Sequence, residues 1–224
     1  MKELKFTLDP SGFPMVWIEG IEAYIHWLPV AKIQFEHFLC ASPDSHFDAS
    51  WYEEVLFLNE RISPGEVRSD NYWKAFLSGI KPSEAKRFAR WCGGSYGLPT
   101  LSEWFDAYKA LKELPPEPIE VIERMGELKD RVRTLLRRVD QASLEPSRRL
   151  PQNRTLADQM LMRLGVMEWV ECTGQRSQWG GMGQTPPAFY GSLFSPDHGQ
   201  PSIPNNPEDH RLHPYGFRLI RRSA

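Results

Sequence analysis

Cysteine is scarce in this sequence of 224 residues, which contains three. Cys40, Cys92 and Cys172 are odd in number, lie far apart and form no CxxC pair. This pattern excludes a disulfide framework and gives no sign of a zinc knuckle. We expect all three to be buried free thiols, because cysteine without a partner behaves as a small hydrophobic residue.

Excess charge and long apolar runs are also absent. The 27 basic and 29 acidic residues give a formal net charge of -2, so no global field attracts nucleic acid or an anionic membrane. No apolar run approaches the ~18 residues of a membrane span, and residues 1–10 lack the apolar core and cleavage site of a signal peptide. We therefore expect a cytoplasmic protein that binds neither nucleic acid nor membranes.

The composition instead favours a packed domain with much irregular chain. A hydrophobic fraction of 41%, with 12% aromatic residues, is enough for a core. The 16 glycines and 19 prolines interrupt the chain so often that its regular elements must be short. We expect a single α+β domain over residues 1–224, in which helices pack on short twisted strands.

The N-terminal part begins with two strand-like stretches, residues 13–18 and 21–27, and in the second stretch apolar and polar residues alternate. Residues 30–40 carry apolar side chains at helical spacing, which predicts a first helix. In residues 41–79 aromatic anchors are separated by turn residues, without a sustained period of either kind. We predict that this stretch is an irregular loop.

Two further helices carry clear end signals. The first is predicted over 81–92, because Pro82 stands near its start, apolar residues follow at i, i+3, i+4 and i+7, and two glycines end it. The second is predicted over 100–112. Thr100 and Glu103 form the pattern of a capping box, in which each side chain accepts a hydrogen bond from the other residue's backbone amide.

Residues 113–150 look like a helical insertion, within which 119–141 form a long amphipathic helix. Its apolar residues are spaced alternately by four and three, which is a heptad seam. The seam consists of Val121, Met125, Leu128, Val132, Leu135 and Val139. The helix either folds back on its own domain or docks on a partner or a second copy. Beyond residue 150 short apolar runs alternate with loops, and a final strand-like run closes the domain.

Four segments follow one another along the chain: the predicted helix after Pro29-Val30, residues 80–104, residues 164–169 (LGVMEW) and residues 216–219 (GFRL). In this order they resemble the motifs of the formylglycine-generating-enzyme-like (sulfatase-modifying factor) family, which has a C-type-lectin-like fold. The first segment is similar to the family's opening helix, and the others resemble its "A…W…YRLPTEAEWE" block, its "GNVWEW" and its terminal "GFR". The resemblance implies a lectin-like scaffold with short twisted strands, two or three helices and much irregular chain.

Within that resemblance, several residues have scaffold roles rather than catalytic ones. They cap a helix, fill the core, permit a turn or pair a buried charge. Arg218 is expected to pair with a carboxylate such as Glu103 or Glu168. The expected structural residues are Thr100, Glu103, Trp104, Glu168, Trp169, Gly216, Phe217 and Arg218.

The chain also departs from the family in ways that bear on function. The family's oxidases use two cysteines shortly before "GFR" to bind copper and attack the substrate peptide, whereas here no cysteine follows Cys172. Cu(I) requires soft thiolate ligands, so we expect no formylglycine-generating activity. Cys172 has no histidine beside it to form a thiolate, and we expect it to be inert. Gly97 and Gly165 also replace an arginine and an asparagine of the family motifs, and no calcium site is evident.

The C-terminal loops are the candidate binding surface. They combine aromatic and basic side chains with glycine- and proline-rich segments, a composition that recognition surfaces use. The candidate ligand-binding residues are Trp179, Phe189, Tyr190, Phe194, His198, His210, Arg211 and His213. The aromatic residues could equally be hydrophobic anchors of a loop-rich fold.

A metal site is the other hypothesis for these loops. His198, His210 and His213 lie near Asp197, Glu208 and Asp209, and such ligands suit zinc or non-haem iron. The spacing is not diagnostic, and surface polarity is the commoner reason for histidines in such a loop. We assign no metal ligand, no cofactor and no catalytic residue.

We expect a divergent, non-catalytic member of this family that binds a peptide, protein or small ligand through its C-terminal loops. The alternatives are a metal-dependent oxidoreductase using non-haem iron or copper, or an accessory subunit that completes a partner enzyme's site. A structural role in an assembly through helix 119–141 is a third possibility.

Overall fold

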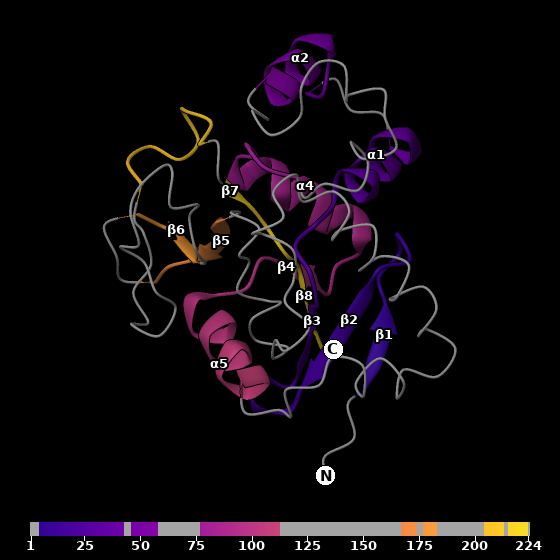
Figure 1. Ribbon diagram of the computed structural model, residues 1–224, viewed down its shortest axis with the longest axis vertical. Helices are drawn as coiled ribbons and strands as arrows, with labels where there is room; N and C mark the ends of the chain where they lie inside the picture. The colour runs from indigo at the N-terminus through magenta and orange to yellow at the C-terminus, as the bar shows by residue number, and fades with distance from the viewer. Residues whose placement is uncertain are drawn as a thin grey trace, which may run out of the picture.

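The computed structural model describes residues 5–42, 46–57, 77–112, 167–173, 177–182, 204–212 and 215–223 (Figure 1). Within these ranges the chain is mixed α+β, as expected from the sequence, and it contains four α-helices and two sheets. The predicted insertion at 113–150 and its seam on helix 119–141 lie outside the described residues. None of the helices within the described ranges is both long and apolar enough to cross a bilayer.

The larger sheet joins the two ends of the described chain. Its strand order is β1-β2-β3-β8-β4, and every pairing is antiparallel. The strands are β1 (Phe6–Leu8), β2 (Pro14–Ile18), β3 (Ala23–His26), β8 (Ile220–Arg222) and β4 (Tyr96–Gly97). β2 and β3 fall within the two predicted strand-like stretches, and the C-terminal strand β8 closes the domain by pairing between β3 and β4.

The smaller sheet has the order β6-β5-β7, with β5 antiparallel to β6 and parallel to β7. Its strands are β5 (Met167–Glu171), β6 (Trp179–Met182) and β7 (Tyr215–Gly216). Trp169 pairs in register with Gly181, and its ring centroid lies 4.3 Å from that of Tyr215. A Cβ at Gly181 would lie 2.5 Å from the Tyr215 ring, so only glycine allows this packing.

Three predicted helices are present: α1 (Lys32–Ala41), α4 (Pro82–Cys92) and α5 (Leu101–Lys112). In Figure 1, α1, α2 and α4 gather at one end of the molecule, while α5 lies beside the larger sheet. At the start of α5 the predicted capping box forms: the Thr100 amide donates to Glu103 Oε2 (2.7 Å) and the Glu103 amide to Thr100 Oγ1 (3.2 Å). Local signals therefore sufficed for these helices.

The loop predicted for 41–79 is wrong at residues 49–57, which form helix α2 (Ala49–Phe57). Its N-terminus is capped by Asp48, whose Oδ1 accepts a hydrogen bond from the Trp51 amide (2.9 Å). Trp51 and Val55, one turn apart, are both buried. The cap and the i, i+4 pair are visible in the sequence, but the surrounding aromatic residues obscure the helical period.

An aromatic cluster forms the core between α1, α2 and α4. Phe35 stacks on Trp51 and on Phe88, with ring centroids 5.7 Å and 5.6 Å away, and meets Phe217 edge-on. Aromatic pairs in these arrangements stabilise beyond their buried area by about 0.5–1.5 kcal/mol. Phe217, expected as a core residue, therefore joins the C-terminal strands to the helical end of the molecule.

Cys92 and Cys172 are buried as expected, but Cys40 is exposed, so the prediction of three buried thiols is wrong at that position. Cys40 lies in the last turn of α1, and the helix packs on the core through Phe35, Phe38 and Leu39, which leaves Cys40 on the outer side.

Candidate functional site

One buried polar network in the described part of the chain is centred on Arg218. Its guanidinium makes a bidentate ion pair with Glu168, in which Nε contacts Oε2 and Nη2 lies 2.6 Å from Oε1. Nη1 donates to the carbonyls of His26 (2.8 Å) and Trp27 (2.9 Å). Trp104 Nε1 donates to Glu168 Oε2 at 2.8 Å, and Arg218, Glu168 and Trp104 are all fully buried.

Of the two carboxylates expected for Arg218, the structure uses Glu168. Glu103 instead pairs with Arg222, at 2.8 Å and 2.7 Å. The Arg218 network ties β5, α5 and the end of β3 to the chain before β8, and it is closed to solvent. Its role in this geometry is to hold the scaffold together.

A second buried network lies around Asp9 and His26. The Leu219 amide donates to His26 Nδ1 (3.3 Å), so His26 Nε2 carries the proton and donates to Asp9 Oδ2 (3.0 Å). Gln34 Nε2 also donates to Asp9 Oδ2 (3.2 Å). Burial would raise the pKa of Asp9, but the hydrogen bonds from His26, the Phe13 amide and the Ser11 hydroxyl together outweigh it and lower the pKa. Because the pair is buried, it acts within the fold.

Arg211, a candidate ligand-binding residue, is a brace in the structure. Its Nη1 and Nη2 bind Glu84 Oε2 (2.6 Å) and Oε1 (2.7 Å), and its Nε pairs with Glu54 at 2.9 Å. Its Nη1 also donates to the carbonyl of Gly79 (3.0 Å). The Arg211 side chain is 5% exposed and the Glu84 side chain is fully buried, so little of either group is open to a ligand.

Glu84 lies on α4 and gathers several donors besides Arg211. Trp51 Nε1 donates to its Oε1 (2.7 Å), and the Lys81 amide donates to its Oε2 (2.8 Å). Burial would raise the pKa of Glu84, but the hydrogen bonds, first that of Arg211, lower it. The sequence analysis missed Glu84, although a glutamate three residues after Lys81 is the usual N3 acceptor at a helix start.

The segment with the proposed metal ligands also supports α4. Glu208 accepts hydrogen bonds from the Ser83 amide (3.0 Å) and hydroxyl (2.6 Å), which satisfies a free donor at the helix N-terminus. Asp209 and His210 are exposed. In the described part of the chain, no three His, Cys, Asp or Glu side chains are placed to hold a metal ion. His198 and His213 lie outside that part.

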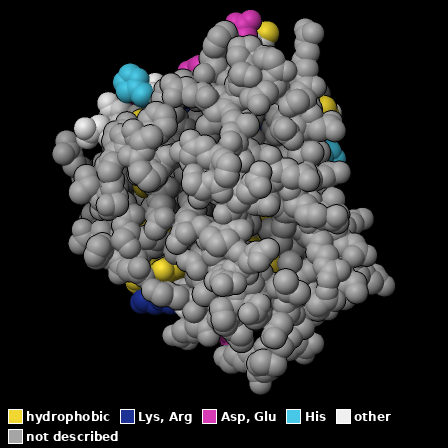
Figure 2. All heavy atoms as spheres, viewed as in Figure 1, with side chains coloured by type: hydrophobic (Ala, Val, Ile, Leu, Met, Phe, Trp, Pro, Cys, Tyr) yellow, Lys and Arg dark blue, Asp and Glu magenta, His cyan; other side chains and the backbone are white. Residues whose placement is uncertain are grey.

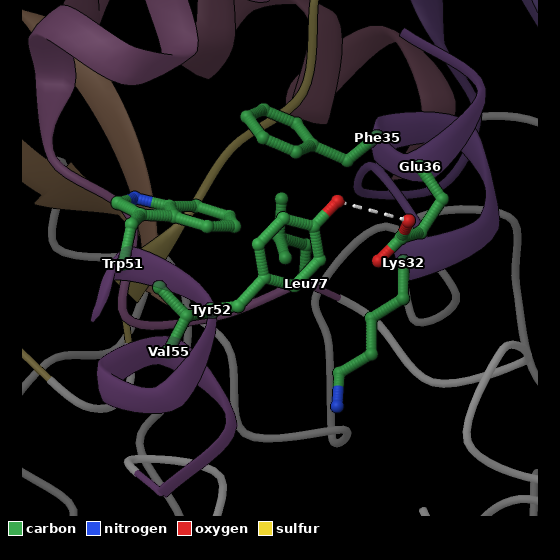
Figure 3. Close-up of a pocket in the computed structure, with 7 residues that line it drawn as sticks. All are labelled: Lys32, Phe35, Glu36, Trp51, Tyr52, Val55 and Leu77. Carbon is green, nitrogen blue, oxygen red and sulfur yellow. Dashed lines mark hydrogen bonds between the residues drawn. The ribbon is translucent and has the colours of Figure 1, made fainter. Parts of the chain in front are cut away.

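A small pocket lies between α1 and α2, with Trp51 in its wall (Figure 3). Its lining residues are Lys32, Phe35, Glu36, Trp51, Tyr52, Val55 and Leu77. The Tyr52 hydroxyl donates to Glu36 Oε2 at 3.2 Å, while the Lys32 amine extends away from that hydrogen bond. The enclosed volume is about 10 Å³, which is room for about one water molecule.

Burial dominates the electrostatics of this pocket. It lowers the pKa of Lys32 to about 7, against the charge of Glu36, which favours the protonated amine. Burial likewise raises the pKa of Glu36, against the hydrogen bond of Tyr52 and the charge of Lys32. The pocket therefore holds an amine that titrates near neutral pH, but in this shape it is too small for a substrate.

The buried thiols are poorly suited to nucleophilic or soft-metal chemistry. Burial raises the pKa of Cys172, and burial together with the charge of Asp9 raises that of Cys92. Cys172 Sγ lies 3.9 Å from the carbonyl of Val170. Both groups are thus held as neutral thiols near pH 7.

The candidate aromatic residues fall into two sets. Trp179 is 6% exposed and lies beneath Lys86, whose Nζ is 4.5 Å from the centroid of the ring, so it anchors β6. Phe189, Tyr190, Phe194, His198 and His213 lie outside the described residues. The structure does not bring the predicted ligand-binding residues together within its described part.

The described anchors do lie on both sides of segment 183–203. Before it, β6 pairs along its whole length with β5. After it, Glu208 and Arg211 bind α4 and its neighbours, and the Tyr215 ring packs on Trp169. In the space-filling view the described side chains reach only a small part of one face, mostly along its rim, and form no broad hydrophobic patch there (Figure 2).

No family profile matches the chain, and no curated protein matches it in sequence. One solved structure, titled "Crystal Structure of CarF", aligns with 94% of this chain and 87% of that chain, at 14% identity and a TM-score of 0.44. At that score the likeness does not establish a common fold.

Proposed function

We propose that this chain is a divergent, non-catalytic relative of the formylglycine-generating-enzyme-like proteins, with a C-type-lectin-like fold. It binds a peptide, protein or small ligand through the C-terminal segment 183–213. The observation that carries the proposal is that described residues anchor both ends of this segment. β6 pairs with β5 before the segment, Arg211 binds Glu84 near the segment's C-terminal end, and Tyr215 packs on Trp169 just after it.

This arrangement supports binding because recognition residues are commonly placed on loops that a rigid scaffold positions. Both anchors consist of buried contacts: the ladder between β5 and β6, and the Arg211–Glu84 ion pair. The segment itself carries Phe189, Tyr190 and Phe194. Aromatic side chains provide a large contact area at a low cost in side-chain entropy.

The thiols support the non-catalytic part of the proposal. Oxidation of a peptide cysteine in the family depends on a pair of accessible thiolates before the "GFR" motif. Here the sequence has no cysteine after Cys172, and burial raises the pKa of that thiol.

A panning experiment tests the proposal. A phage library of random dodecapeptides is selected on the immobilised wild-type protein, and each enriched peptide is then titrated against three proteins. They are the wild type, the variant Phe189→Ser/Tyr190→Ser/Phe194→Ser, and the control variant Phe105→Ser, which removes a half-buried aromatic side chain from α5.

We expect enriched peptides to bind the wild type and the control equally, and to bind the triple variant at least about tenfold more weakly. The reason is that truncating one aromatic hot-spot residue costs about 2 kcal/mol or more of binding free energy. Unchanged melting temperatures show that the variants are folded. Peptides that bind the triple variant as tightly as the wild type would refute the proposed location of the site.

A further inference from the structure

A row of aromatic and basic side chains crosses the larger sheet on the face away from Val16, Ile25 and Ile220. The strand register places Trp17 of β2 opposite Tyr24 of β3, Tyr24 opposite Arg221 of β8, and Arg221 opposite Tyr96 of β4. Directly paired residues project from the same face of a sheet, so these four side chains are neighbours. All four are partly exposed, whereas the residues that alternate with them on β2 and β3 are buried.

The guanidinium of Arg221 is held between two tyrosines. It lies over the Tyr24 ring, 4.6 Å from the centroid, and Trp17 packs edge-on against the same ring, with the two ring centroids 5.0 Å apart. Tyr96 is paired with Arg221 in the strand register, which brings its hydroxyl within reach of a hydrogen bond from the guanidinium. An arginine fixed in this way has lost much of its side-chain freedom in advance, so a ligand that binds it does not bear that cost again.

Within the described part of the chain, the charge of Arg221 is not neutralised by an acidic side chain. The adjacent Arg222 is paired with Glu103 through two contacts of 2.8 Å and 2.7 Å. Arg221, by contrast, has no carboxylate within ion-pair distance among the residues that the structure describes. Its planar fork has five N–H donors, more than the single hydroxyl of Tyr96 can accept.

Arg221 also lines a groove of about 310 Å³ together with Tyr24, Ser95, Arg222 and Ser223. The volume is at the lower end of the range for small-molecule sites, about 300–1,000 Å³. The hydroxyl of Ser223 donates to the carbonyl of Glu22 (3.1 Å), while the exposed Ser95 adds a hydroxyl at the rim. The groove thus offers a fixed cation, a hydroxyl donor and an aromatic wall.

We propose that this groove binds an oxyanion, a carboxylate or a phosphate monoester, through the guanidinium of Arg221, with the organic part of the ligand against Tyr24. Both anions match the bidentate geometry of a guanidinium. This site lies on the larger sheet (Figure 1) and contains no residue of segment 183–213. It is therefore independent of the function proposed above.

Isothermal titration with three aromatic probes tests the site: benzoate carries a carboxylate, phenyl phosphate a phosphate, and phenol no charge. They are titrated at low salt into the wild type, Arg221→Met, Arg221→Lys and the control Arg90→Met, which removes an exposed arginine from α4. Arg221→Met keeps the stem over Tyr24 but not the charge, and Arg221→Lys keeps the charge but not the fork.

We expect benzoate, phenyl phosphate or both to bind the wild type and Arg90→Met with equal affinity. Binding to Arg221→Met should be at least about tenfold weaker, because losing a hydrogen bond to a charged group lowers the affinity by at least that factor. Arg221→Lys should have an intermediate affinity, since it keeps the charge but not the planar fork. The anion that binds identifies the ligand class. If Arg221→Met does not fold, Arg221→Lys provides the comparison. Equal binding by wild type and variants, equal binding of phenol, or no saturable binding of either anion at millimolar concentration would overturn the proposal.

Discussion

Replacement of Arg218 by methionine is the most informative test of the scaffold. The change leaves the buried Glu168 carboxylate with the indole N–H of Trp104 as its remaining described donor, and removes the donor to the carbonyls of His26 and Trp27. Removing one partner of a buried ion pair costs about 3–5 kcal/mol, because an uncompensated charge stays in the core. Since small domains are stable by only about 5–15 kcal/mol, Arg218→Met is expected to lose a large part of its stability.

The second arginine–glutamate pair supplies the matched control. Arg222 and Glu103 are also joined by two contacts, but their side chains are 42% and 20% exposed. An exposed pair contributes about 0–1 kcal/mol, so Arg222→Met is expected to be nearly neutral. The predicted difference between the two variants is therefore about 2–5 kcal/mol.

Urea unfolding, followed by tryptophan fluorescence and circular dichroism, measures both variants. The double variant Glu168→Gln/Arg218→Met removes the stranded charge and should recover part of the loss. It also provides a readout if Arg218→Met does not fold. The reasoning is refuted if Arg218→Met costs no more than Arg222→Met, or if the double variant is as unstable as the sum of its single changes.

Three further predictions concern the three cysteine thiols and the amine of Lys32. A maleimide should label one thiol of the native protein, Cys40, and three after denaturation; native labelling of Cys92 or Cys172 would contradict their burial. Burial lowers the pKa of Lys32 to about 7, so the cost of burying its charge is greatest below that pH and fades as the pH rises toward the unfolded value. The stability of the wild type relative to Lys32→Met should thus increase between about pH 6 and pH 9, and a constant difference would exclude the shifted pKa. A cysteine-bearing sulfatase-type peptide, incubated with the protein, copper and oxygen, should keep its mass; an aldehyde product lost in Cys172→Ser would show that one thiol suffices.

Local sequence signals account for much of the fold. Helices α4 and α5 could be predicted because Pro82 and the Thr100–Glu103 capping box mark their starts within a few residues of chain. Helix α2 has such a signal in Asp48, but the aromatic residues that serve the core also resemble loop anchors. Phe47, Trp51 and Tyr52 stand close together in the sequence, and this density of aromatic residues hides the helical spacing of Trp51 and Val55.

The polar networks could not be predicted in the same way, because their partners are far apart in the sequence. The sequence leaves Arg218 two possible carboxylates, and only the packed structure decides for Glu168. Arg211 and Glu84 are separated by 127 positions, so nothing near Arg211 indicates that it is a brace rather than a ligand contact. Exposure is likewise a tertiary property, as Cys40 shows.

Amide hydrogen exchange, with and without a peptide selected on the wild type, tests the proposed location of the binding site most directly. The peptide should slow exchange in segment 183–213, while the ladders of the larger sheet and helices α1 and α2 keep their rates. Protection that appears instead at the α1–α2 pocket or on β3 and β8, with segment 183–213 unchanged, would contradict the account.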